Sequence, residues 1–146
     1  MIETVESIEA KEQDIVEEFS LFEDWMDKYE HLIGLGQDLP LIDESLKTED
    51  LLIKGCQSRV WLHAKLEDDK VVFSADSDAI ITKGIISLLV RVLSGQTTEA
   101  IINTELSFVN QIGLKEHLSP TRSNGLVSMI KQMKLYALAF RTQQNG

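Results

Sequence analysis

The sequence predicts an α+β fold, in which a small antiparallel three-stranded sheet is packed with helices. Two observations carry this prediction. Between residues 14 and 33, and again after residue 119, apolar side chains recur every three or four positions, which is the period of an amphipathic helix. Between residues 60 and 66 apolar and polar side chains alternate, as in a strand with one buried face. The order of helix, neighbouring strands and further helices is typical of the α+β class.

The first helix is predicted over residues 14–33, where mostly acidic residues stand between the apolar ones. Gly34 and Gly36 are expected to end it, because glycine is common just past a helix C-terminus. Residues 35–50 mix Pro, Gly, Asp and Ser without a clear period. A loop with at most one helical turn is therefore expected there.

The three strands are expected at residues 51–54, 60–66 and 70–74. Asp68 and Asp69 supply the chemistry of a tight reversal between the second and third strands. The first strand would pair on the other side of the second. The loop between the first two strands would then carry the only cysteine of the chain at its tip.

A nearly apolar helix is predicted next, with Asp76, Ser77 or Asp78 as its N-cap, because these side chains accept hydrogen bonds from the first free N–H groups. Gly95 is expected to close it. Gly84 lies inside this helix at a cost of about 0.5–1 kcal/mol relative to alanine. We therefore expect a neighbouring backbone to approach closely at Gly84.

Residues 97–113 are predicted to form one or two short helices. The last helix is better defined, with Ser119 as its N-cap and Pro120 at its first position. Its buried face is expected to contain Leu126, Ile130, Met133, Ala137 and Phe140.

Length and composition favour one domain over residues 1–146, since 146 residues with 43% hydrophobic side chains suffice for one core. Its ends, before about residue 8 and after about residue 141, are expected to fray. A net charge of −10 disfavours nucleic acid and anionic membranes as partners. The longest apolar stretch is interrupted by Lys83 and Arg91, so no membrane span is expected.

The first fourteen residues are acidic and lack a basic segment followed by an apolar one. We therefore expect neither a secretory signal nor a transit peptide, and a cytoplasmic protein. One cysteine excludes an internal disulfide. The three histidines, His31, His63 and His117, are scattered without the spacing of a zinc site, so no metal is expected.

Cys56 is the first candidate functional residue. Its neighbours are turn-forming or polar, and Lys54 and Arg59 are close enough in sequence to favour a thiolate, the form of cysteine that attacks. Taken alone, a single cysteine is more often a small buried apolar residue than a nucleophile. His63 or His117 could serve it as a base in a thiol hydrolase, although neither stands in a recognisable context.

Arg122 is the second candidate. In the first turn of the last helix, the helix dipole disfavours a cation by about 0.3–1 kcal/mol, so another interaction should compensate. Arg122 could form a surface pair with Glu116 or Asp76. Alternatively, it could reach the Cys56 loop and stabilise an anion there.

Three segments that contain these candidates resemble the signatures of SufE-type sulfur-acceptor proteins, including the CsdE branch. They are GCQSRVW (residues 55–61), ADSDAIITKGI (residues 75–85) and HLSPTRSNGL (residues 117–126), which agree in order and spacing. The resemblance extends over residues 17–140, almost the whole chain. It implies an α+β fold similar to that of IscU-type scaffolds.

The resemblance also implies a function. In that family the loop cysteine, here Cys56, takes sulfur as a persulfide from a SufS-type cysteine desulfurase, stimulates that enzyme, and passes the sulfur to a SufBCD-type iron–sulfur scaffold. Pyridoxal phosphate belongs to the desulfurase, so no cofactor is expected in this chain. Arg122 is implied to lie near the cysteine loop. The residues implied to form the loop or contact the partner are Gly55, Gln57, Ser58, Arg59, Asp76, Ser77 and Asp78.

Persulfide transfer requires a thiolate that can be exposed, a positive environment and no second cysteine that would release the sulfur by forming a disulfide. We expect the resting thiol to be partly shielded, because a free persulfide is easily oxidised. Other readings are a CsdE-like relay to a different acceptor, a non-catalytic interaction module, and a thiol redox sensor. The absence of a resolving cysteine weighs against the sensor.

Overall fold

The computed structural model describes residues 7–40 and 42–145. The expected fraying before residue 8 falls largely outside these residues, whereas the last helix continues past residue 141. The elements are α1 (Ile8–Ser20), α2 (Trp25–Gln37), the 3₁₀ turns η1 (Glu44–Leu46) and η2 (Glu49–Leu51), β1 (Val60–Glu67), β2 (Lys70–Ser77), α3 (Ile80–Leu93), β3 (Gln96–Thr97), α4 (Thr98–Asn103), α5 (Phe108–Gln111), α6 (Leu114–His117) and α7 (Pro120–Asn145).

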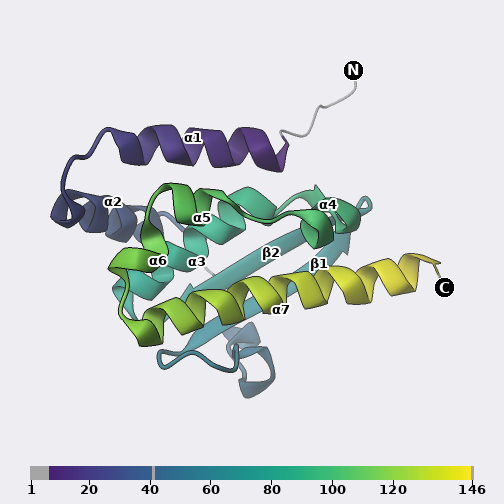
Figure 1. Cartoon of the computed structure of the whole chain (residues 1–146). Coiled ribbons are helices and arrows are strands. Elements are labelled where there is room, and N and C mark those ends of the chain that lie inside the picture. The colour runs from purple at the N-terminus through teal and green to yellow at the C-terminus, as the bar shows by residue number, and fades with distance from the viewer. Residues whose placement is uncertain (1–6, 41, 146) are drawn as a thin grey trace.

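The α+β prediction is confirmed, with a three-stranded antiparallel sheet in the order β1-β2-β3 (Figure 1). β1 and β2 form a hairpin paired from Val60 with Ser77 to Glu67 with Lys70. Asp68 and Asp69 make the turn, both with positive φ of 52° and 65°, as expected for a tight hairpin. β2 extends beyond the predicted residues 70–74.

The predicted first strand at residues 51–54 is wrong. That segment contributes only an isolated bridge between Leu52 and Trp61, because the chain turns away from β1 after Ile53. The third strand is β3, where Gln96 pairs with Val71 on the other edge of the hairpin. Two residues are too few to show an alternating pattern, so no sign of β3 is present in the sequence.

The predicted single helix over residues 14–33 is two helices. α1 ends at Ser20, and Asp24 caps α2 by accepting a hydrogen bond from the backbone N–H of Asp27 at 2.9 Å. Gly34 and Gly36 do not end the helix, because α2 continues to Gln37. The apolar period continues from α1 into α2, because both helices bury one face in the same core. The change of direction between them therefore cannot be recognised from the spacing of apolar residues.

α2 and α3 cross at Gly36 and Gly84, where the backbones of the two helices are in direct contact. A Cβ on Gly84 would overlap the Leu32 carbonyl oxygen and lie 2.8 Å from Leu32 Cγ, and a Cβ on Gly36 would lie 2.8 Å from the Gly84 nitrogen. The close approach expected at Gly84 is therefore confirmed. Glycine is required at this crossing because a methyl group would force the helices apart.

The core lies between the sheet and the helices that cover it. Val60, Leu62, Val71, Phe73 and Ala75 point to one face of the hairpin and are buried. α3 packs on β2, and α7 runs along the hairpin, where Tyr136 donates a hydrogen bond to the Leu62 carbonyl at 3.3 Å (Figure 1). The predicted face of α7 is confirmed, with Leu126, Met133 and Ala137 fully buried and Ile130 and Phe140 partly buried.

The ends of the later helices follow the predictions in part. Ser119 caps α7 by accepting from the Arg122 N–H at 3.3 Å, as predicted. α4 and α5 occupy the predicted residues 97–113, and α6 is an additional short helix. The predicted N-cap of α3 is wrong: Ala79 takes that position, because Asp76 and Ser77 belong to β2 and Asp78 is turned toward the Cys56 loop.

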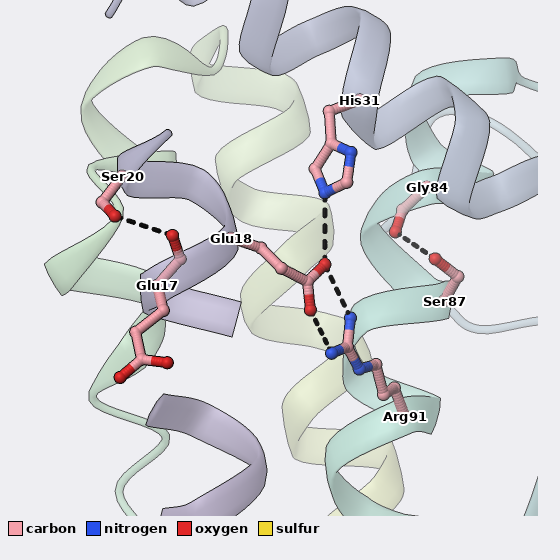
Figure 2. A network of polar contacts seen from close by, with 7 residues as sticks. All are labelled: Glu17, Glu18, Ser20, His31, Gly84, Ser87 and Arg91. Atoms are coloured by element: carbon pink, nitrogen blue, oxygen red, sulfur yellow. Dashed lines mark hydrogen bonds and ion pairs between the residues drawn. The ribbon is translucent and has the colours of Figure 1, made fainter. Parts of the chain in front are cut away.

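Glu18 joins the three helices α1, α2 and α3 (Figure 2). Its carboxylate accepts hydrogen bonds from both terminal nitrogens of Arg91 and lies 3.3 Å from His31 Nε2. The hydrogen bonds from Arg91 outweigh partial burial and lower the pKa of Glu18. Among the described helices, none is long and apolar enough to cross a membrane.

Candidate functional site

The Cys56 loop lies between two fixed points of the backbone. Before it, the Ile53 N–H donates to the Val60 carbonyl at 2.9 Å, and after it β1 begins. Gly55 has a φ of +93°, a conformation that favours glycine, and a Cβ there would lie 2.5 Å from Ser128 Oγ. Glycine at position 55 thus allows the loop to turn sharply and to pack directly against α7.

Cys56 is half-buried on the side of α7. Its Sγ lies 3.6 Å from the Gly125 carbonyl oxygen, to which the thiol donates a weak hydrogen bond. The partial shielding expected for the resting thiol is therefore present. Burial raises the pKa of Cys56. The expectation that Lys54 and Arg59 favour the thiolate is wrong for this conformation, because both are exposed and burial dominates the pKa.

A cavity of about 320 Å³ adjoins the thiol. It brings together the cysteine loop, the first turn of α3 and the first turns of α7. Its lining residues are Cys56, Gln57, Ser58, Thr82, Ile85, Ser119, Thr121, Arg122, Gly125 and Met129. Three of the residues implied for the site, Gln57, Ser58 and Arg122, therefore share a cavity with Cys56.

Arg122 belongs to this cavity rather than to a surface pair. Within the described residues it forms no ion pair with Glu116 or Asp76. Asp76 is instead engaged by two lysines. Arg122 thus lines the cavity beside Cys56 with an exposed side chain, and its stabilisation of an anion there stays a prediction.

The segment from Asp76 to Asp78 holds the far end of the cysteine loop. The Arg59 N–H donates to Asp78 Oδ1 at 3.0 Å, and the Asp78 N–H donates to the Arg59 carbonyl at 3.2 Å. Ser77 Oγ donates to the same carbonyl at 2.8 Å. Arg59 is therefore held mainly through its backbone, and its side chain is free to extend into solvent.

Asp76 is 6% exposed and is therefore buried rather than on the surface. Its Oδ2 lies 2.8 Å from Lys47 Nζ, and its Oδ1 lies 3.2 Å from Lys83 Nζ and accepts from the Ser77 N–H at 2.8 Å. Burial alone would raise the pKa of Asp76, but the hydrogen bonds from Lys47, Ser77 and Lys83 outweigh it, and the pKa is lowered.

The sequence did not point to Lys47 or Lys83. Lys47 stands in a segment without periodicity, where nothing marks it as different from the other surface lysines. Lys83 offered a weak signal, since it is one of two charges in a nearly apolar helix. A charge in that position requires a partner, and the partner is Asp76.

The two histidines considered as bases do not reach the thiol cavity. His117 stacks on Trp25 with ring centroids 4.0 Å apart, and its Nδ1 lies 3.0 Å from the Gly113 carbonyl oxygen. His63 lines a separate groove of about 720 Å³. The geometry therefore gives no support to a Cys–His hydrolase. Among the described residues, no group of three or more His, Cys, Asp or Glu side chains could hold a metal ion.

Fold and site together define a class: an α+β protein with one partly covered thiol, carried on a short loop beside a cavity that contains an arginine. The chain belongs to the SufE family, described as an Fe–S metabolism associated domain, whose model matches residues 13–137. The sequence resemblance is thereby confirmed, and the chain is placed in iron–sulfur metabolism.

Relatives with sequence similarity agree with this assignment. The chain is 38% identical over 138 residues to SufE-like protein 1, chloroplastic/mitochondrial, of Arabidopsis thaliana, a match that covers 94% of this chain and 37% of the Arabidopsis protein. This chain therefore spans well under half the length of that relative. It is also 38% identical over 125 residues to an uncharacterised SufE-like protein of Rhizobium meliloti, covering 82% of this chain and 89% of that protein.

The fold is similar to that of a solved structure, a hypothetical protein from Thermus thermophilus. The TM-score is 0.75, and the match covers 90% of this chain and 96% of that chain. Sequence identity is 22%, so this likeness concerns the fold alone.

Proposed function

We propose that this protein accepts sulfur on Cys56 from a SufS-type cysteine desulfurase, stimulates that enzyme, and relays the sulfur to a SufBCD-type iron–sulfur scaffold. The observation that carries the proposal is the half-buried Cys56 Sγ on a glycine turn, beside a cavity that contains Arg122. Family membership supports the role in iron–sulfur metabolism.

The transfer step is a displacement at sulfur. The Cys56 thiolate attacks the terminal sulfur of the persulfide on the desulfurase cysteine. A new S–S bond forms to Cys56 Sγ, the S–S bond of the donor breaks, and the donor cysteine leaves as a thiolate. The proton lost by Cys56 balances the one taken up by the donor thiolate, so no oxidant or reductant is required. The pyridoxal phosphate of the overall reaction belongs to the desulfurase.

Arg122 supplies the positive charge that this step requires. In the resting loop, burial raises the pKa of Cys56 and disfavours the thiolate. A guanidinium in the same cavity offsets that effect once the thiol ionises, and it stabilises the persulfide anion after transfer. This role also accounts for a cation in the first turn of α7, where the helix dipole opposes it.

The loop must move for a donor to reach Sγ. The thiol makes one weak S–H···O contact of 3.6 Å with α7 and packs half-buried against the core, so its release costs that burial but no strong hydrogen bond. Loops permit such movement where a packed strand does not. The loaded sulfur could then return to the cavity beside Gln57 and Ser58, where water and oxidants have less access.

The test is intact mass spectrometry after incubation with a desulfurase and free cysteine. The wild-type protein should gain the mass of one sulfur atom, removable by a thiol reductant, and Cys56→Ser should gain none. Arg122→Ala should accept sulfur more slowly without unfolding. Arg141→Ala is its matched control, since Arg141 is an exposed arginine near the other end of α7. A wild-type protein that stays unmodified would refute the proposal.

Further measurements separate the other readings. An interaction module predicts that Cys56→Ser stimulates the desulfurase as well as the wild type, and a redox sensor predicts an intermolecular disulfide under mild oxidant. A pull-down would distinguish a SufS–SufBCD route from a CsdE-like relay. We also propose the cytoplasm as the location, which cell fractionation tests, although the Arabidopsis relative is named chloroplastic/mitochondrial.

A further inference from the structure

Both arms of the Cys56 loop are attached to the same three residues of β2 and the turn after it. The outgoing arm is attached at Arg59, whose backbone N–H and carbonyl bond to Asp78 and Ser77 at 2.8–3.2 Å. These bonds fix the orientation of the peptide that leads into β1. Arg59 therefore cannot leave its place without breaking three hydrogen bonds.

The incoming arm is attached at Lys47. Its ammonium lies 2.8 Å from Asp76 Oδ2 and 5.4 Å from the centre of the Trp61 ring. Trp61 is opposite Asp76 in the hairpin and also forms the bridge to Leu52. A chain of contacts thus runs from Asp76 through Lys47 and Trp61 to the residues that precede the loop.

The residues between the two arms are held much less. Residues 54 and 55 form a backbone turn, and the side-chain hydrogen bond shown for residues 54–58 is the weak contact from Cys56 Sγ to the Gly125 carbonyl oxygen. The thiol segment is therefore held mainly by packing against α7, while both of its ends are held by hydrogen bonds and an ion pair.

We propose that Asp76, Ser77 and Asp78 form a clamp with Lys47, which positions the Cys56 loop by fixing both arms and confining its movement to residues 54–58. These are positioning residues that act through the backbone of the loop. The clamp itself is a property of the fold, whereas its benefit for sulfur acceptance rests on the proposed function. A short mobile segment loses less conformational entropy when it docks than a long one, so the clamp favours productive encounters.

Asp76 offers an internal control for this proposal. Lys47 and Lys83 bind the same carboxylate, and their side chains are similarly covered, at 20% and 23% exposure. Only Lys47 belongs to the incoming arm, since Lys83 lies in α3. Removing either lysine leaves Asp76 with the other one, so neither substitution creates an unpaired buried charge. The two variants lose the same formal charge, but Lys47→Met also removes the ion pair of Lys47 with the exposed Glu44 at 3.0 Å, so Glu44→Gln is measured beside them to isolate the loss of the contact with Asp76.

The first experiment compares Lys47→Met with Lys83→Met by the alkylation rate of Cys56 with iodoacetamide over a range of pH. The rate at high pH, where the thiol is fully ionised, reports access to Sγ, and the midpoint reports its pKa. Lys47→Met should raise the high-pH rate about three- to tenfold, because the incoming arm can then open together with residues 54–58 without breaking the ion pair to Asp76. Lys83→Met should remain within about twofold of the wild type.

The second experiment measures sulfur transfer to Cys56 from the desulfurase. Lys47→Met should accept sulfur more slowly although its thiol is more accessible, and Lys47→Arg should restore both rates. A merely structural role would move the melting temperature of the two variants alike and would not produce opposite changes in alkylation and transfer. Equal alkylation rates in Lys47→Met and Lys83→Met would overturn the clamp. Absence of transfer to the wild type would instead refute the proposed function and leave the alkylation result standing.

Discussion

The close crossing of α2 and α3 predicts how much a methyl group at Gly84 lowers the free energy of unfolding. Gly84→Ala would place a methyl group 2.8 Å from Leu32 Cγ and 2.9 Å from the Leu32 carbonyl carbon, against backbone that cannot move independently of α2. Such overpacking costs about 1–3 kcal/mol. The higher helix propensity of alanine returns about 0.5–1 kcal/mol. Because the overlap is with backbone, the upper part of the overpacking range applies, and we expect a net loss of about 1–2 kcal/mol.

Gly34→Ala is the matched control, because Gly34 lies in α2 and its Cβ would have no atom within 4 Å. This variant keeps only the propensity effect and should gain about 0.5–1 kcal/mol. Denaturant unfolding followed by circular dichroism measures both free energies of unfolding. A thermal scan should show shifts of about 2–4 °C per kcal/mol, in opposite directions. The close-packing argument fails if Gly84→Ala is as stable as Gly34→Ala.

Two predictions concern ionisation. Burial raises the pKa of Cys56, so the midpoint of its alkylation profile should lie above the ordinary cysteine value of about 8.5 and return to it in denaturant. The stability that the neutral thiol contributes is present below the ordinary pKa and is lost as pH rises through the raised one, a loss that Cys56→Ser should not show. The pKa of Glu18 is lowered, chiefly by hydrogen bonds from Arg91. The advantage of the wild type over Glu18→Gln should therefore be present above the ordinary glutamate pKa and disappear as pH falls through the lowered one. Melting temperatures across that pH range would contradict this if the two curves stayed parallel.

The proposed clamp and the proposed sulfur-accepting site would serve different requirements of the proposed reaction. A carrier thiol has to be covered when it holds sulfur and exposed when it receives it. In the proposed reaction α7 and Gly125 would cover Cys56, and a movement of residues 54–58, which have few hydrogen bonds, would expose it. The attachments at Arg59 and Lys47 limit how far the exposure extends.

Local patterns in the sequence were enough to predict the class of fold, the last helix, the close contact at Gly84 and the family. These patterns are the helical and strand periods, a capping serine before a proline, a glycine inside a strong helix, and three motifs whose residues stand together in the chain. The position of Arg122 at the cysteine loop was open from the residues alone and was implied by the resemblance.

Four other features depend on how the chain packs: the third strand, the corner between α1 and α2, the raised pKa of Cys56, and the engagement of Asp76 by Lys47 and Lys83. The physical reason is the same in each case. Each of these features forms only where segments that are distant in the sequence pack against each other. This holds for the two-residue strand, the corner between two helices, the burial of the thiol and the ion pairs of Asp76. Contacts of this kind leave no pattern in the neighbouring residues, so Cys56 and the segment from Asp76 to Asp78 could be found in the sequence, whereas Lys47 and Lys83, which bind Asp76, could not.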